Sequence, residues 1–139
     1  MTSLRYLLVL GWAVWLGSVV FFSFVVAPTA FGALGRDGAA PLMRAIFPRY
    51  YLAALASGGI MLIAALGLGA DLRVTVPIVI GLALAGYARQ VVTPAVNRAR
   101  ESHDEARFAQ LHALSVRLNL VVLAILLLLG TVVAGIARG

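Results

Sequence analysis

The chain has 139 residues, of which 63% are hydrophobic and only 12% are charged. Soluble domains are about half apolar and about a quarter charged, so the composition indicates a membrane protein. No cysteine is present, which excludes disulfides and thiolate metal sites. The net charge is +6, and every residue that carries a positive side chain at neutral pH is an arginine. Because the arginines cluster at the ends of apolar segments, we expect them to mark membrane topology and lipid contacts rather than nucleic-acid binding.

Four apolar segments are long enough to cross a bilayer, which takes about 20 residues each. They are residues 6–27, 50–70, 74–96 and 118–137. The first is too long for a signal-peptide core, so we expect it to be retained. The sequence therefore predicts an all-α integral membrane four-helix bundle, with residues 1–139 forming a single four-transmembrane-helix domain.

The first connection is predicted to carry a short interfacial helix. Pro41 suits a first helical turn, Leu42 and Ile46 then share a face, and Pro48 is expected to end the helix. A plain basic loop is the alternative. The second connection, Asp71 to Arg73, is so short that spans two and three should form a tight antiparallel hairpin.

Arginine is concentrated in the first and third connections. These hold Arg36, Arg44, Arg49, Arg98, Arg100 and Arg107, with Arg117 at the edge of the fourth span. The positive-inside rule then places both connections in the cytoplasm and both termini outside it. We expect a bacterial inner-membrane location.

Small residues recur at four-residue spacing within the spans, as in Ala54/Gly58 and Gly81/Ala85. This spacing lets helix backbones approach closely in lipid. Four short helices make a thin bundle, so we expect the chain to associate with further copies of itself as a homo-oligomer, a dimer or trimer. Membrane lipids are the other expected partners.

The fourth helix is predicted to begin before the membrane and to extend into the cytoplasm. Ser102 and Glu105 fit a capping box at its start. A seam with alternating three- and four-residue spacing follows, and its cytoplasmic half is polar. That half consists of Glu105, Phe108, His112, Ser115 and Asn119.

The third helix carries a matching polar stretch, LAGYARQVVTPAVN, at residues 84–97. At ideal helical spacing Gln90, Thr93, Asn97 and Arg100 share one face. With a turn near residue 101, Gln90 falls level with His112, so the two polar halves should meet. Buried polar groups in lipid must pair with one another.

Arg89 is harder to explain than Arg117. Arg117 tilts toward cytoplasmic water and can snorkel, whereas Arg89 tilts toward the bilayer centre. We therefore expect Arg89 to face the bundle and to hold Glu105, backbone carbonyls with Asn119, or a bound anion or lipid headgroup. A hydrogen-bonded clamp between helices three and four is the alternative role.

The remaining candidates point to weaker sites. The indole amides of Trp12 and Trp15 are candidates to bond Ser115 or Asn119, although core packing is favoured for both. The two histidines do not share a helical face, so no metal site and no cofactor are expected. His112 and Ser115 lack an intramembrane acid, so catalytic chemistry is not favoured.

Three segments carry a family resemblance: GWAVWLGSVVFFSFVVAPTAF, IFPRYY and NRARESHDEARFAQLHALSVRLN. Together they resemble the DUF4149, or TMEM205-like, family of small four-span membrane proteins. The resemblance implies the four-helix architecture but supplies no activity. The positions that it marks here are Trp12, Gly17, Phe24, Phe47, Pro48, Tyr50, Phe108, His112, Ser115 and Asn119.

The predicted function is that of a non-enzymatic membrane protein that binds or moves a small anionic or amphiphilic ligand. Its cytoplasm-facing cleft is expected between helices three and four. The predicted site residues are Arg89, Gln90, Asn97, Glu105, His112, Ser115, Asn119 and Trp15. The aliphatic outer halves of both helices favour binding over conduction. A structural or accessory subunit is the alternative, and a membrane enzyme using His112 is the third.

Overall fold

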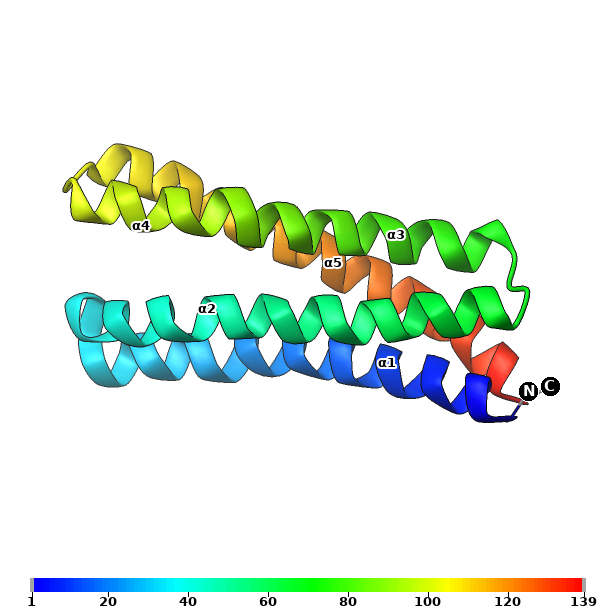
Figure 1. Ribbon diagram of the computed structural model, residues 1–139. Coiled ribbons are helices and arrows are strands. Elements are labelled where there is room, and N and C mark those ends of the chain that lie inside the picture. The colour runs from blue at the N-terminus through cyan, green and yellow to red at the C-terminus, as the bar shows by residue number, and fades with distance from the viewer. Residues whose placement is uncertain (1, 139) are drawn as a thin grey trace.

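The computed structural model describes residues 2–138, which form long helices joined by tight turns (Figure 1). In chain order these are α1 (Thr2–Phe21), the π-helical turn η1 (Phe22–Val26), α2 (Ala27–Gly67), α3 (Leu72–Tyr87), the π-helical turn η2 (Ala88–Val92), α4 (Thr93–Glu101) and α5 (Glu105–Arg138). The all-α prediction is confirmed for this part of the chain.

Three continuous helical stretches are long and apolar enough to cross a membrane. They are Thr2–Gly67, Leu72–Glu101 and Glu105–Ile136. The first folds back on itself, because α1 packs along α2 (Figure 1). The protein is therefore a helical membrane protein by the length and composition of its helices.

The first reversal is made at Gly35. Its backbone has φ 66° and ψ −179°, a region that is essentially restricted to glycine. The helix continues from α1 through η1 up to this point and resumes directly after it. Consequently the first connection is a sharp kink rather than a loop.

The predicted short helix between Pro41 and Pro48 is wrong as a separate element. Both prolines lie inside α2, which continues to Gly67. A proline removes one helical hydrogen bond, whereas ending the helix would leave several backbone groups at the new terminus without a partner in the helix. Continuing the helix is therefore the cheaper solution.

The tight hairpin predicted between spans two and three is confirmed. Gly69, with φ 65°, lies in the turn after α2, and the Asp71 side chain accepts a hydrogen bond from the Arg73 amide at 2.7 Å. This is a standard N-terminal cap for α3.

The turn between α4 and α5 is also tight, but its cap differs from the prediction. Asp104 accepts a hydrogen bond from the Arg107 amide at 3.0 Å and so caps α5. Ser102 instead donates to the Ala99 carbonyl at the end of α4. His103 adopts φ 53° between them. The predicted Ser102–Glu105 capping box is wrong because Ser102 still belongs to the end of the preceding helix.

Two π-helical turns interrupt helices in the same way, η1 between α1 and α2 and η2 between α3 and α4. Each is followed, two residues later, by a proline: Pro28 after η1 and Pro94 after η2. Proline cannot donate the amide hydrogen that closes an α-helical turn, and a π-turn accommodates one extra residue there. One extra residue rotates the faces before and after it by about 100° relative to an unbroken helix.

The core is closed at the end of the bundle that holds both termini and the α2–α3 turn (Figure 1). Trp15 packs against Gly58 and Gly81, and Trp12 donates its indole hydrogen to the Leu126 carbonyl of α5 at 2.8 Å. The α5 face beyond Asn119 is aliphatic and buried. It consists of Val122, Leu126, Leu129 and Val133.

The opposite end holds Gly35 and the 102–104 turn, and we call it the basic end. It carries Arg36, Arg44, Arg49, Arg98, Arg100 and Arg107. Here α4 packs mainly on α5, and η1 contacts only α1 and α2. The bundle therefore has two halves, one formed by α1, η1 and α2 and the other by α3, η2, α4 and α5, and these halves separate toward the basic end.

Candidate functional site: a pocket at the basic end

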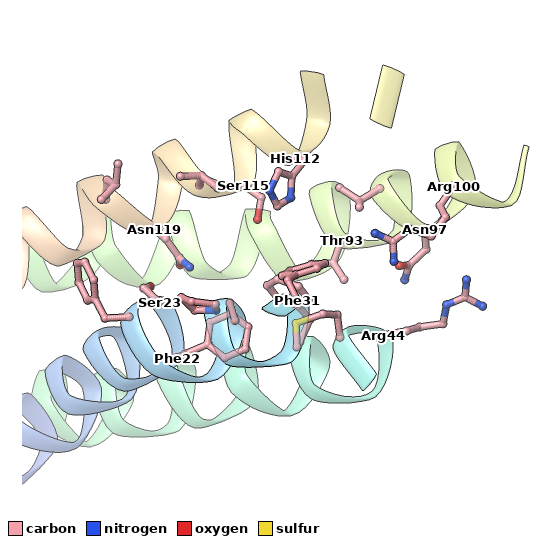
Figure 2. Close-up of a pocket in the computed structure, with 18 residues that line it drawn as sticks. Phe22, Ser23, Phe31, Arg44, Thr93, Asn97, Arg100, His112, Ser115 and Asn119 are labelled. Atoms are coloured by element: carbon pink, nitrogen blue, oxygen red, sulfur yellow. The ribbon is translucent and has the colours of Figure 1, made fainter. Parts of the chain in front are cut away.

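A pocket of about 430 Å³ occupies the space between the two halves of the bundle. Figure 2 shows side chains from η1 and α2 on one side and from α4 and α5 on the other. The pocket differs in chemistry along its length, with aromatic residues at its inner end and basic residues at its mouth.

The polar wall comes from α4 and α5. Thr93, Asn97 and Arg100 project from α4, and His112, Ser115 and Asn119 project from α5 (Figure 2). Successive members on each helix are three or four residues apart, which is the spacing of one helical face. Asn119 is held in place because its side-chain oxygen accepts a hydrogen bond from the Tyr50 hydroxyl of α2 at 3.1 Å.

An aromatic cluster lies at the inner end of the pocket, where Phe22 and Phe47 line the wall and Tyr50 and Tyr51 pack behind them. The Phe22 ring stacks on Tyr50 with centroids 4.6 Å apart and meets the edge of Phe47 at 5.1 Å. Tyr51 packs against Tyr50 at 4.9 Å. The sequence-based site did not include this cluster. The available signal was the IFPRYY segment, in which Phe47 and Tyr50 recur at the spacing of one helical turn.

The mouth of the pocket carries two arginines, Arg44 from α2 and Arg100 from α4 (Figure 2). The Arg100 guanidinium lies 4.6 Å from the centroid of the Phe108 ring, an arrangement that stabilises the cation. Arg44 forms an ion pair with Glu101, whose carboxylate lies 3.2 Å from it.

His112 lies before the apolar run that begins at Leu118, and its ring stacks on Phe108 at 5.8 Å. Partial burial, and then the nearby charges of Arg100 and Arg36, lower the pKa of His112 below its ordinary value. The imidazole is therefore neutral at physiological pH and offers one hydrogen-bond donor and one acceptor to the pocket.

Of the predicted site residues, Asn97, His112, Ser115 and Asn119 lie together in the pocket wall. Arg89, Gln90 and Glu105 lie outside that wall; Gln90 and Glu105 are exposed and Arg89 is half-buried. The pocket lies between the two halves of the bundle, and its polar wall comes from α4 and α5, the helices between which the cleft was predicted.

The reason for the difference is the π-helical turn η2. It contains Arg89 and Gln90, so these residues and the Asn97 side of the helix no longer share a face. Of the partners considered for Arg89, Glu105 does not pair with it, and the ion pair formed among the described side chains joins Arg44 and Glu101.

Trp15 lies in the core and not in the pocket wall, with 1% of its surface exposed. It borders a separate small cavity of about 10 Å³, together with Tyr51 and Asn119. The Trp12 indole bonds the Leu126 carbonyl, and the Trp15 indole nitrogen has no hydrogen-bond partner within the described residues. The packing role favoured for both tryptophans therefore fits, and the alternative bonds to Ser115 or Asn119 are not formed.

Comparison with known proteins gives one match. The family model for a domain of unknown function, DUF4149, matches residues 10–105. No curated protein and no solved structure matches the chain. The matched range runs from Leu10, within α1, to Glu105, the first residue of α5. It includes Arg44 and Arg100 but not His112, Ser115 or Asn119. Because the match spans well over half of the sequence, the chain belongs to the DUF4149 family.

Proposed function

We propose that this protein binds an anionic amphiphile in the pocket at the basic end, without catalysing a reaction on it. The observation that carries the proposal is the polarity of the pocket along its length. Arg44 and Arg100 stand at the mouth, whereas Phe22, Phe24 and Phe31 line the apolar wall. An anionic headgroup between the arginines and an apolar chain along the phenylalanines would match both ends.

The proposed four-span topology would place the pocket across the membrane boundary. The predicted spans end near residues 27 and 96 and begin near residues 50 and 118. Phe24 and Leu120 lie inside these limits and line the pocket while remaining 63% and 53% exposed. Arg44, Arg100 and His112 lie outside them. An apolar chain in the pocket would thus point toward lipid, with its headgroup at the level of the interface.

The lengths of the helices support this placement. With 34 residues, α5 is about 51 Å long at 1.5 Å per residue, while a hydrocarbon core is about 30 Å thick. About three fifths of α5 would therefore lie in lipid, and the rest would project on the basic side. The positive-inside rule assigns that side to the cytoplasm, and a bacterial inner membrane remains our proposed location.

Binding is favoured over conduction in a single bundle. The α5 face beyond Asn119 is aliphatic and at least 96% buried from Val122 to Val133. No polar side chain on that face continues the pocket toward the other end of the molecule. Movement of a ligand across the membrane would require an oligomeric pore or a rearrangement of the bundle, and self-association is part of this proposal.

The test uses the full-length protein purified in a non-ionic detergent. Dodecyl phosphate, dodecanol and inorganic phosphate are titrated separately, and binding is followed by calorimetry. We expect dodecyl phosphate to bind most tightly, because only it supplies both a charged head and a chain. Arg100→Gln should weaken that binding at least about tenfold, since a hydrogen bond to a charged group contributes roughly 1.5–3 kcal/mol.

Arg107→Gln is the matched control. Arg107 is an exposed arginine at the same end that does not line the pocket. Equal binding of dodecyl phosphate and dodecanol would refute the role of the headgroup. Equal affinity of the Arg100 and Arg107 variants would refute the assignment of the site. Inorganic phosphate binding as tightly as dodecyl phosphate would replace the amphiphile by a simple anion.

A structural or accessory role is the second candidate, and the hydrogen bond from Tyr50 to Asn119 favours it. This bond joins α2 to α5 beside the pocket, as a helix clamp would. If Asn119→Leu lowers thermal stability and leaves ligand binding unchanged, the polar seam is a clamp. The membrane-enzyme role has less support, because the ring neighbour of His112 is Phe108 and the cation nearby is Arg100. Neither supplies the acid that orients a catalytic histidine.

A further inference from the structure

The ion pair between Arg44 and Glu101 crosses the mouth of the pocket. Arg44 belongs to α2 and Glu101 is the last residue of α4, and their side chains approach to 3.2 Å. Arg44 lines the pocket, whereas Glu101 does not. The carboxylate therefore engages one of the two mouth arginines from outside the site.

An anionic headgroup in the mouth would compete with Glu101 for the same guanidinium. Arginine holds a carboxylate or a phosphate through paired N–H groups in a planar fork, so one strong acceptor reduces what is available to another. The Glu101 charge also repels an anion placed beside Arg44. Both effects weaken ligand binding.

The same ion pair is one of few links between α4 and α2. The short α4 packs mostly on α5, and its contacts with α2 are sparse. Both partners are about half exposed, at 48% for Arg44 and 59% for Glu101, so the pair can separate into solvent at small cost. Losing it would leave the mouth free to widen without disturbing the core around Trp15.

We propose that Glu101 is an internal competitor that occupies Arg44 while the pocket is empty and is displaced by the acidic headgroup of the ligand. This inference rests on the proposed function, because it concerns the same pocket. It makes Glu101 a residue that lowers the affinity of the site, and it predicts that an acidic headgroup gains more from displacing Glu101 than an uncharged one does.

The experiment compares the affinity of full-length variants for dodecyl phosphate in non-ionic detergent. Glu101→Gln keeps the size of the side chain and removes its charge. We expect it to bind about two- to fivefold more tightly than the wild type, the range for an exposed ion pair. Glu105→Gln is the control, because Glu105 is an exposed acid at the same end, outside the pocket wall. It should change affinity much less.

A double-mutant cycle with Arg44→Gln separates competition from simple repulsion. If Glu101 acts mainly through Arg44, the gain from Glu101→Gln should be much smaller in the Arg44→Gln background, where only direct repulsion remains. An undiminished gain in that background would overturn the proposal, because the carboxylate would then act on the ligand directly. Equal affinity of the Glu101 and Glu105 variants would also overturn it.

The proposed function and the proposed role of Glu101 can be refuted separately. If neither the wild type nor any variant binds dodecyl phosphate, the proposed function is wrong. If the wild type binds it and Arg100→Gln weakens it, but Glu101→Gln leaves affinity unchanged, the binding site stands and the internal competitor does not.

Discussion

The contact between Trp15 and Gly58 allows a sharp test of how the bundle is packed. A Cβ added at position 58 would lie 2.5 Å from Cζ3 of Trp15 and 2.7 Å from Cδ2 of Leu82. Real side chains do not approach so closely, so α1 or α3 must shift. We therefore expect Gly58→Ala to destabilise the protein.

The magnitude follows from two opposing effects. Overpacking of a well-filled core costs typically about 1–3 kcal/mol. Replacing glycine by alanine inside a helix returns roughly 0.5–1 kcal/mol, because the backbone loses less entropy on folding. Trp15 is buried between two helices that approach it through glycines, so it has little room to move. We expect a net loss of about 0.5–2 kcal/mol for Gly58→Ala.

The adjacent glycine supplies the control. A Cβ at Gly59 would meet nothing within 4 Å, so Gly59→Ala should be neutral or slightly stabilising. The assay is thermal unfolding of purified protein in one detergent, followed by circular dichroism. If Gly58→Ala proves as stable as Gly59→Ala, Trp15 does not occupy the slot between α2 and α3 and the packing described above is wrong.

Two further predictions concern local hydrogen bonds. Asp104→Ala should lower the free energy of unfolding by about 0.5–2 kcal/mol, because it removes the cap that accepts from the Arg107 amide, and Ser102→Ala should lower it less. Thermal unfolding of the two variants checks this order. The reverse order would restore the capping role to Ser102. Tyr50→Phe should cost about 0.5–1.5 kcal/mol, because it breaks the bond to Asn119 while keeping the ring stack; an unchanged melting temperature would show that this bond contributes nothing net to stability.

Much of the fold was predictable because it depends on features that one sequence displays directly. Long apolar runs predict long helices, and the short polar segment at Asp71 predicts a tight turn. Both agree with the structure. The polar face of α5 was also predictable, since the spacing of His112, Ser115 and Asn119 is that of an uninterrupted α-helix, and α5 is uninterrupted over this stretch.

The errors arise where the backbone leaves ideal α-helical geometry. Ideal spacing placed Gln90 with Asn97, but the π-helical turn η2 separates them. The same applies to Pro48, which was expected to end a helix that in fact continues. A proline indicates that the helix is locally irregular, but the helices packed around it decide whether the helix ends, continues or forms a π-turn.

The aromatic cluster and the Arg44–Glu101 pair were missed for a different reason. Each joins residues from helices far apart in the chain, such as Phe22 with Tyr50 or Arg44 with Glu101. Periodicity describes one helix at a time and does not indicate which faces of two helices meet. Only the register set by the Gly35 kink and the 68–71 turn brings these side chains together.

The tightness of the three reversals has a consequence for how this molecule can change. The chain turns at Gly35, at residues 68–71 and at residues 102–104, so it has almost no loops on which to place recognition residues. In most proteins, binding specificity diverges through insertions and substitutions in loops that leave the scaffold intact. Here the pocket is built from helix faces, and residues such as Asn119 both line it and hold the helices together. Any new ligand preference must therefore be acquired at the expense of packing, which ties the evolution of specificity in this protein to its stability.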